Sequence, residues 1–447
     1  MKVGIVGTGY VGLVTGVSLA EKGHEVLCLD VDRARVDMVN RGVPPFFEPG
    51  LEEALGRVVS SGNLRASDSY GDLAGFEVVL ICVNTPSAAD GSMDSSQLVS
   101  AAASVGDVLG DMKKSVGFPV VAVKSTVLPG TTLGVVRNTL ESVSGMVAGV
   151  DFGLAMVPEF LREGSALEDA RRPDRVVVGA FDRRSGDVLS SLYGDFGSPV
   201  VVTDAVTAEM VKYVANSFLA TKISFANEMA RICDRVGADV YRVMDIVAMD
   251  RRIERSFLNA GPGFGGSCFP KDVRALARFA EENNVRPLIL RSVLEINESQ
   301  PVYVVDVLEK VLGGLRNRRV AVLGLSFKGG TDDVRESRAF PIVRELKKRG
   351  ANVVCYDPAA GKNFAEKEPV DLAEDIKSAL EGADACVIQS DWDEFRSLQP
   401  GDFRVMKTPV VYDTRRVLGF ESGEVTVLRV GGGIPGIKRD THDGGAL

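Results

Sequence analysis

The pattern of hydrophobic and polar positions divides the chain into three parts. In residues 1–203, short runs rich in β-branched residues alternate with segments of helical length. The strand-like runs are KVGIVG, HEVLCLDVD, EVVLICVNTP, PVVAVKSTVLPG, FGLAMVPE and RVVVGA. Such an alternation is typical of a doubly wound parallel sheet with helices on both faces. The first part is therefore predicted to be an α/β domain.

The second part, residues 204–302, has a helical period. The stretch AEMVKYVANSFLATKISFANEMARICDRVG keeps its apolar residues at helical spacing and has neither Gly nor Pro before Gly237. We expect one long central helix here, with shorter helices beside it. The third part, residues 303–447, returns to strand–loop–helix patterns, beginning at RRVAVLGLSFKGGTDD. The predicted fold class is α/β: two doubly wound Rossmann-like domains joined by a central helical domain with one long helix.

Composition excludes several classes of protein. A chain of 447 residues is too long for one hydrophobic core, which agrees with several domains. The net charge of −9 argues against a general nucleic-acid or anionic-membrane surface. No apolar run approaches the roughly 18 residues that span a bilayer, and the opening MKVGIVG lacks the layout of a signal peptide. We expect a cytoplasmic protein that binds neither nucleic acid nor membrane.

The cysteines and histidines limit the available chemistry. None of the six cysteines forms a CxxC pair, so neither a disulfide framework nor a zinc site is indicated, and no metal is expected. The cysteines interpreted as core residues, from their apolar surroundings, are Cys28, Cys82, Cys233, Cys355 and Cys386. Histidine occurs only twice, so acid–base chemistry must rely on Lys, Glu, Asp or Cys.

The best candidate for a cofactor site is the turn GTGYVG. Gly7, Gly9 and Gly12 follow a short strand and open a helix, and Asp30 ends the next strand about 20 residues on. Glycines let the backbone approach a pyrophosphate, which the helix N-terminus can bind through free N–H groups. Asp30 can accept from ribose hydroxyls and would repel a 2′-phosphate, so NAD is predicted over NADP, although Arg35 nearby favours NADP. A tight turn without a ligand is the alternative.

Further candidates lie in loops after the predicted strands, where open α/β sheets bind ligands. They are Thr85 and Pro86, Thr126, and the pair Glu159 and Glu163. The threonines and the proline are also compatible with ordinary turns. Glu159 and Glu163 are four residues apart and share a face if their loop is helical, and a solvated surface is the alternative.

The segment GPGFGGSCFPKD places one cysteine in a loop built to bend. Glycines within residues 261–266 allow a tight backbone, and Cys268 follows near the start of a predicted helix, with Lys271 beside it. A thiol there should hold enough thiolate to act as a nucleophile, the alternative being a surface thiol of no consequence. Beside a dinucleotide site, this predicts oxidation through a thiohemiacetal and a thioester. Lys212 and Asn216, four apart on the predicted long helix, share a face and are weak evidence alone.

Along nearly the whole chain these motifs resemble the UDP-glucose/GDP-mannose dehydrogenase family. The motifs are GTGYVGLVTG, EPGLEE, STVLPGTT, PEFLREGSA, KYVANSFLATKISFANE, FLNAGPGFGGSCFPKD and LGLSFKGGTDDVRES. Members oxidise the 6-alcohol of a nucleotide sugar to a uronic acid in two NAD-dependent steps. The resemblance implies an NAD-binding domain at 1–203, a central dimerisation domain at 204–302 and a nucleotide-sugar-binding domain at 303–447. It also implies a homodimer or a higher homo-oligomer, with the long helix at the interface.

The resemblance further implies roles for single residues. Cys268 would be the nucleophile. Lys212, Asn216 and Asp272 would hold the oxyanion and a catalytic water, and Thr126 and Glu159 would assist that water, with Glu159 as the base for thioester hydrolysis. NAD would contact Gly7, Gly9, Tyr10, Val11, Gly12, Asp30, Arg35, Thr85, Pro86, Thr126, Glu163, Lys271 and Arg335. The sugar nucleotide would contact Glu159, Phe160, Leu161, Arg162, Glu163, Lys212, Asn216, Arg252, Phe257, Leu258, Asn259, Ala260, Gly261, Gly265 and Lys328.

The substrate is the least constrained part of this interpretation. The stretch RRIERSFLNAGPGFGGSCFPKD favours the UDP-glucose branch, with UDP-glucuronate as product, over UDP-N-acetylhexosamines or GDP-mannose. A non-catalytic nucleotide-sugar sensor would leave the complete catalytic motifs without a use. A β-hydroxyacid dehydrogenase of similar layout would leave Cys268 unexplained and would reduce one NAD rather than two. Val157 and Arg172 depart from the family pattern, in which Asn is usual at both positions.

Overall fold

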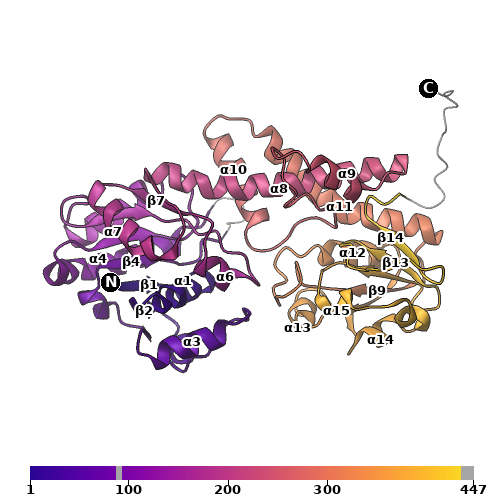
Figure 1. Cartoon of the computed structure of the whole chain (residues 1–447), viewed down its shortest axis with the longest axis horizontal. Helices are drawn as coiled ribbons and strands as arrows, with labels where there is room; N and C mark the ends of the chain where they lie inside the picture. Colours follow the sequence, from indigo (N-terminus) through magenta and orange to yellow (C-terminus); the bar gives the residue numbers. More distant parts are fainter. Residues whose placement is uncertain (87–92, 434–447) are drawn as a thin grey trace. The chain divides into compact units, whose positions relative to one another are not determined.

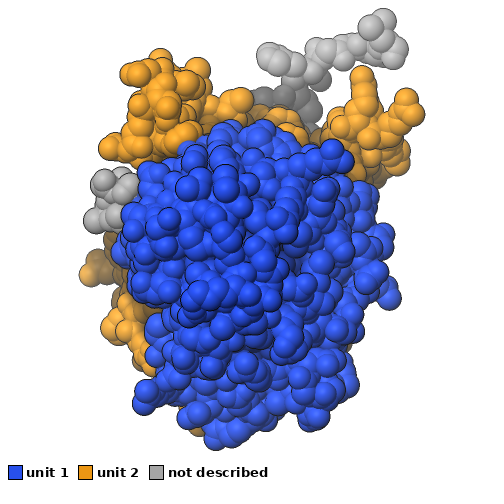
Figure 2. Space-filling view, turned by 90° about the vertical axis from the view of Figure 1, so that its left-hand side faces the viewer, with its two compact units in different colours: residues 1–215 blue, residues 216–447 orange. Residues whose placement is uncertain are grey.

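The computed structural model describes residues 1–86 and 93–433 (Figure 1). The chain forms two compact units, residues 1–215 and residues 216–447 (Figure 2). Each unit has its own sheet, so the predicted pair of Rossmann-like sheets and the long helix are confirmed. The division into three domains at residues 203 and 302 stays a prediction.

An eight-stranded sheet forms the middle of the first unit, in the order β3-β2-β1-β4-β5-β6-β7-β8. Neighbouring strands are parallel, as predicted, with the one exception that β6 and β7 are antiparallel. Strand order reverses at β1 and β4, the position where such sheets bind ligands. The strands are β1 (Lys2–Val6), β2 (Glu25–Leu29), β3 (Leu64–Ser67), β4 (Val78–Ile81), β5 (Val120–Val123), β6 (Gly153–Met156), β7 (Val176–Ala180) and β8 (Val200–Thr203).

Helices cover both faces of this sheet because successive strand side chains point to opposite sides. Val3 and Ile5 of β1 pack in one core cluster with α1 (Tyr10–Glu21), α3 (Leu51–Ser60), α6 (Ala166–Arg171) and α7 (Arg183–Tyr193). Val6 packs in a second cluster with α4 (Ser96–Val116) and α5 (Arg137–Ser144). The remaining elements are α2 (Arg33–Asn40) and the short turns η1 (Tyr70–Gly75), η2 (Thr132–Val136) and η3 (Gly194–Phe196).

The long helix α8 (Ala205–Val236) follows the uninterrupted apolar period of the sequence. It ends where Gly237 adopts a φ of 72°, a left-handed conformation that suits glycine. Near its start, Glu209 accepts hydrogen bonds from the N–H groups of Gly130 (2.6 Å) and Thr132 (2.8 Å), which attaches this end to the first unit. The other helices of the central region are α9 (Val240–Val247), α10 (Phe269–Glu282) and α11 (Leu288–Leu312).

A six-stranded parallel sheet forms the second unit, in the order β11-β10-β9-β12-β13-β14. Its strands are β9 (Arg319–Leu323), β10 (Asn352–Tyr356), β11 (Asp371–Leu372), β12 (Ala385–Ile388), β13 (Val410–Asp413) and β14 (Thr426–Arg429). Its helices are α12 (Ala339–Lys348), α13 (Gly361–Ala365), α14 (Ile376–Leu380), α15 (Asp393–Arg396) and the turn η4 (Pro400–Val405). α11 and α12 contribute to one core cluster of this sheet, and α14 contributes to the other.

The cysteines divide as the sequence predicts. The five interpreted as core residues are buried, Cys268 is half-buried, and all six are free thiols. Burial raises the pKa of Cys82 to about 12, so its thiol stays protonated and unreactive. Within residues 1–86 and 93–433, no helix is long and apolar enough to cross a membrane, and no group of three or more potential ligands could hold a metal ion.

Candidate active site

The turn between β1 and α1 leaves the helix N-terminus open. Gly7 has a φ of 100°, and a Cβ there would lie 2.9 Å from the carbonyl oxygen of Cys82. A Cβ on Gly12 would lie 1.9 Å from the carbonyl oxygen of Gly7. A Cβ on Gly9, the N-cap of α1, would meet nothing within 4 Å, and no side chain caps the helix there. Folding therefore requires Gly7 and Gly12, whereas Gly9 leaves room for a ligand.

Asp30 stands directly after β2, beside this turn. Its Oδ2 accepts hydrogen bonds from the Thr8 N–H (2.9 Å) and the Thr8 hydroxyl (2.5 Å). Partial burial acts to raise the pKa of Asp30, but hydrogen bonds from Thr8 and from backbone N–H groups outweigh it and hold the pKa below its ordinary value. One groove of about 480 Å³ is lined by Gly7, Gly9, Asp30 and Arg35. The residues fit a dinucleotide with a free ribose diol.

The other predicted cofactor residues of this unit lie around the same edge of the sheet. Tyr10 and Val11 form the first turn of α1. The Thr85 hydroxyl donates to the carbonyl oxygen of Thr126 at 2.8 Å, which joins the loops after β4 and β5. The carbonyl of Pro86 accepts the Asp94 N–H at 2.8 Å. These contacts fix the loops in place and leave the proposed NAD contacts of Thr85, Pro86 and Thr126 as predictions.

Glu159 and Lys212 form a buried ion pair. Lys212 Nζ lies 2.7 Å from Glu159 Oε1, and the side chains are 3% and 6% exposed, respectively. The second carboxylate oxygen of Glu159 accepts the N–H of Leu161 at 2.6 Å. Burial acts to raise the pKa of Glu159, but the charge and hydrogen bond of Lys212 outweigh it and hold the pKa below its ordinary value. The hydrogen bond from the Leu161 N–H and then the charge of Lys124 add smaller contributions in the same direction. A charged carboxylate can take a proton from water.

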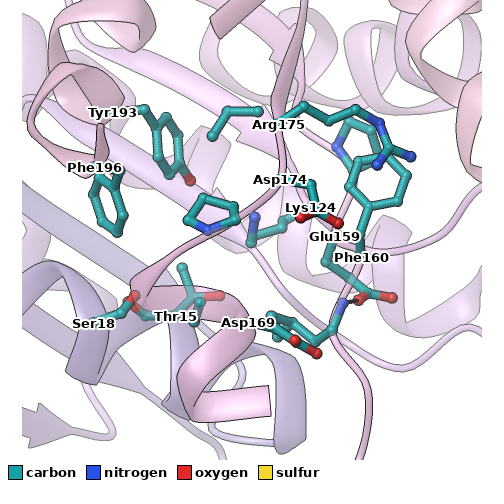
Figure 3. A pocket seen from close by; sticks show the side chains of 15 residues that line it. Thr15, Ser18, Lys124, Glu159, Phe160, Asp169, Asp174, Arg175, Tyr193 and Phe196 are labelled. Atoms are coloured by element: carbon teal, nitrogen blue, oxygen red, sulfur yellow. Dashed lines mark hydrogen bonds between the residues drawn. The ribbon is translucent and has the colours of Figure 1, made fainter. Parts of the chain in front are cut away.

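The segment after β6 is not helical, so Glu159 and Glu163 do not share a helix face. Glu159 instead lines a small cavity of about 70 Å³ that is partly open to solvent (Figure 3). Lys124, which directly follows β5, and Tyr193, the last residue of α7, line the same cavity and are each less than a tenth exposed. Lys124 Nζ lies 5.7 Å from the centre of the Tyr193 ring. Sequence reasoning missed Lys124, although a lysine directly after a buried four-residue strand is itself unusual.

A second pair follows one turn later along α8. Asn216 Nδ2 donates to Asp272 Oδ2 at 2.6 Å, and Lys271 Nζ lies 3.0 Å from Asp272 Oδ1. Asp272 is 1% exposed, in the first turn of α10. Cys268 is the N-cap of α10, and its carbonyl accepts the Asp272 N–H at 2.8 Å. A thiol at a helix N-terminus lies where the helix dipole favours thiolate. The structure thus brings together four of the predicted residues.

The loop before Cys268 owes its glycines to the protein's own packing. A Cβ on Gly263 would lie 2.6 Å from the Asn297 amide oxygen, and one on Gly265 would lie 2.4 Å from the carbonyl oxygen of Glu336. A Cβ on Gly266 would lie 2.8 Å from the Phe327 ring. The loop therefore requires these glycines even without a ligand.

The remaining residues predicted to contact the sugar nucleotide fall into two groups. The first group is the loop 257–261, in which Leu258 and Ala260 are buried and Asn259 is exposed. Phe257 has a φ of 65°, and the Gly261 N–H donates to Asn227 Oδ1 at 2.7 Å. The charged group has partners within its own units: Arg162 pairs with Asp169, Arg252 with Asp250 and Arg335 with Asp333, while Lys328 lies 5.6 Å from the centre of the Phe327 ring. The centre of the Phe160 ring lies 4.1 Å from Arg175 Cζ and 5.6 Å from Lys212 Nζ. Their contacts with substrate or NAD stay predictions.

Comparison with known families covers most of the chain. Residues 1–197 match the NAD binding domain of the UDP-glucose/GDP-mannose dehydrogenase family. Residues 206–299 match the central domain of the same family, and residues 321–420 match its UDP binding domain.

Individual relatives are similar over their full length. A UDP-glucose 6-dehydrogenase of Haloferax volcanii (AglM) is 40% identical over 95% of this chain and 98% of its own. TuaD of Bacillus subtilis, also a UDP-glucose 6-dehydrogenase, is 39% identical over 94% of this chain and 90% of its own. Among solved structures, a UDP-glucose dehydrogenase from Pyrobaculum islandicum superposes with a TM-score of 0.88 at 42% identity, covering 96% of each chain. A UDP-D-ManNAc dehydrogenase from Pyrococcus horikoshii gives 0.86 at 30% identity, covering 97% of this chain and 99% of its own.

Proposed function

We propose a substrate and a mechanism for this protein, which belongs to the UDP-glucose/GDP-mannose dehydrogenase family. It oxidises UDP-glucose to UDP-glucuronate. The overall reaction consumes two NAD⁺ and one water and yields two NADH and three protons, which balances the four electrons removed from the 6-carbon. The full-length relatives at 39–40% identity are UDP-glucose 6-dehydrogenases, and this supports UDP-glucose over other nucleotide sugars.

NAD⁺, when bound, accepts a hydride in each of two steps. The chain's own residues would supply the covalent chemistry. After the first oxidation, the Cys268 thiolate adds to the aldehyde carbon to give a thiohemiacetal. Loss of the second hydride gives a thioester on Cys268, and water then cleaves the carbon–sulfur bond to release the acid and the thiol.

The observation that carries the mechanism is the arrangement of residues on α8. Lys212 of this helix pairs with Glu159, and Asn216, one turn later, pairs with Asp272. Asp272 lies in the first turn of α10, whose N-cap is Cys268. Lys212 and Asn216 are suited to stabilise an oxyanion, one as a cation and the other as a neutral donor. Glu159, charged and buried, is suited to take the proton from the water that attacks the thioester.

A panel of nucleotide sugars, followed by NADH absorbance, tests the proposal. UDP-glucose should give the highest kcat/KM, with two NADH for each UDP-glucuronate and little free aldehyde. A higher kcat/KM with a UDP-N-acetylhexosamine or with GDP-mannose would mean that this nucleotide sugar, and not UDP-glucose, is the substrate. One NADH per product would instead support a β-hydroxyacid type of chemistry and refute the covalent mechanism.

We also propose that the chain associates with itself through α8. Exposed apolar side chains recur along this helix at Val214, Phe218, Phe225, Ile232 and Val236. Spacings of four and seven residues place them along one side of the helix. Burial of such a stripe against a second copy would stabilise a homodimer or larger homo-oligomer. Light scattering of the purified protein, with Phe218→Glu as the variant expected to dissociate, tests this.

A further inference from the structure

The motif EPGLEE, residues 48–53, has no role in the proposed reaction. Its first residue, Glu48, is only 4% exposed and lies just before α3. A buried carboxylate is costly unless hydrogen bonds satisfy it. Glu48 is satisfied from two separate segments of the first unit, and these are the segments assigned above to the two ligands.

The first contact of Glu48 is with the dinucleotide turn. The Tyr10 hydroxyl, from the first turn of α1, donates to Glu48 Oε2. The Tyr10 ring also packs on Phe46, with ring centres 5.1 Å apart. Burial and the neighbouring Glu48 raise the pKa of Tyr10 well above its ordinary value, so the phenol keeps its proton and remains the donor.

The second contact is with the segment after β6. The Gly164 N–H donates to Glu48 Oε2 at 2.7 Å and lies 3.0 Å from the Tyr10 hydroxyl oxygen. The Ala166 N–H, at the start of α6, donates to Glu48 Oε1 at 2.6 Å. Ser165, the N-cap of α6, makes no capping bond with its own side chain, so Glu48 supplies the acceptor that this helix end lacks.

The Gly164 N–H is therefore shared between one oxygen from the dinucleotide turn and one from EPGLEE. Gly164 directly follows the stretch 159–163, which includes Glu159 and residues expected to contact the sugar nucleotide. If the segment and the start of α6 moved away from α1, the buried Glu48 carboxylate would lose three donors, the N–H groups of Gly164, Ala166 and Leu167. The Tyr10 hydroxyl would keep its bond to Glu48 and lose the Gly164 N–H. Losing hydrogen bonds to a buried carboxylate raises the free energy of the protein. These contacts therefore hold the two segments in a defined geometry relative to each other.

We propose that Glu48 and Tyr10 are positioning residues that couple NAD binding at the turn 7–12 to nucleotide-sugar binding at the segment 159–164. A ligand that orders the turn fixes Tyr10, through it Glu48, and through both the Gly164 end of the segment. The coupling is reciprocal, so each ligand raises the affinity for the other by the same factor. The identity of the two ligands rests on the proposed function.

The experiment measures this factor directly. NADH fluorescence gives the Kd of NADH with and without saturating UDP-glucose, a combination that cannot react. In the wild-type protein UDP-glucose should tighten NADH binding. In Tyr10→Phe and in Glu48→Gln the factor should shrink toward one, by about threefold to tenfold, which corresponds to one or two hydrogen bonds. Because the two changes break one cluster, the double variant should be no worse than the more affected single variant.

Glu52→Gln is the matched control, since Glu52 is an exposed carboxylate in the first turn of α3. It should keep the wild-type factor. A merely structural role for Glu48 would lower the melting temperature and the active fraction but leave the factor of the folded molecules unchanged, and that result would overturn the inference. So would the absence of coupling in the wild type. Tyr10→Phe removes a single oxygen and keeps the test available if Glu48→Gln does not fold.

The two proposals fail in different ways. If the wild-type protein oxidises no nucleotide sugar, the proposed function is refuted. If it oxidises UDP-glucose while both variants keep the wild-type coupling factor, the function stands and the positioning role is refuted.

Discussion

Two glycine-rich segments lie at the starts of the helices α1 and α10, and their glycines have different structural roles. In the turn 7–12, the N-cap Gly9 has open space where a side chain would be. In the loop 261–266, the glycines pack against the protein's own groups, and the N-cap of the next helix is Cys268. One helix end thus leaves open space for a non-covalent ligand, while the other carries Cys268, the proposed nucleophile. A similar pattern in the sequence supports two kinds of chemistry.

Replacing the nucleophile should have the largest effect. Cys268→Ser keeps the size of the side chain but removes the thiolate, so turnover should fall by several orders of magnitude. NADH absorbance measures it. Cys233→Ser is the control, because Cys233 is a buried thiol on α8 within a core cluster, and it should keep its activity. A fully active Cys268→Ser variant would mean that the second helix end serves binding alone.

Removing the proposed base should separate oxidation from hydrolysis. Glu159→Gln keeps the size of the side chain but not its basicity, so steady turnover should fall about 100- to 10,000-fold. Both oxidations should still run, giving a burst of two NADH per site and then a stall. Mass spectrometry should find the sugar-nucleotide acyl group on the peptide that holds Cys268. Lys212→Ala should slow the burst itself, because oxyanion support is needed in both stages. If Glu159→Gln showed a normal steady rate and no adduct, another residue would have to act as the base.

Much of the difference between the two glycine-rich segments can be predicted from the sequence, because it depends on residues that are close together in the chain. The sequence signals are short-range: the strand before Gly7, the helix that follows Gly9, the carboxylate of Asp30 after the next strand, and a cysteine at the start of a helix. The edge strands β3 and β11 were missed because LRAS and DL have little apolar content. The reversed direction of β7 was missed because strand orientation depends on the connection and not on the strand's composition.

The buried charges could not be predicted for a related reason. Lys124 and Glu48 look like surface residues, since Lys and Glu usually are. Their burial depends on elements distant in sequence, α7 for Lys124 and the residues around Gly164 for Glu48. The constraint on Gly265 has the same origin, because the carbonyl of Glu336 stands where its Cβ would lie.

Matched glycine substitutions test the comparison itself. Gly265→Ala forces a Cβ to within 2.4 Å of a backbone oxygen, so the variant should lose about 1–3 kcal/mol of unfolding free energy. Gly9→Ala meets nothing within 4 Å and should melt like the wild type, but its methyl group should obstruct the ligand and raise the KM for NAD. Calorimetry and initial rates measure the two effects. Equal loss of stability in both variants would show that Gly9 is also a packing residue.

We expect Asp30, the carboxylate beside the turn 7–12, to set the choice between NAD and NADP. Asp30→Ala should weaken NAD binding, because hydrogen bonds to a charged acceptor contribute about 1.5–3 kcal/mol each at most. The same change removes the repulsion of a 2′-phosphate, with Arg35 in the same groove, so the ratio of kcat/KM for NAD over NADP should fall. Asp30→Ala also removes the two hydrogen bonds from Thr8, and Thr8→Val measures separately the loss of the one from the hydroxyl. A wild-type preference for NADP would contradict this role of Asp30.

The smallest expected effect concerns Lys124. Several charged or titratable groups act on Glu159: Lys212 from α8 holds its pKa down most strongly, Lys124 adds to this, and Cys82 stays neutral. Asp169, Asp174, Arg175 and Tyr193 line the cavity beside it. Lys124→Met keeps the length of the side chain but removes one positive charge. The pKa of Glu159 should then rise toward its ordinary value.

The direction of the pH effect follows from the role of the base. As the proposed base, Glu159 would act only when it is deprotonated, so a raised pKa of Glu159 should move the acid limb of the kcat profile to higher pH. Well above this limb the carboxylate is charged in either protein, and kcat should match the wild type. Initial rates across the acid range measure the shift. Lys114→Met, an exposed lysine of α4, is the control and should leave the limb in place. An unmoved limb in Lys124→Met would mean that Lys212 alone sets the charge of Glu159, and that the buried lysine serves the packing around Tyr193.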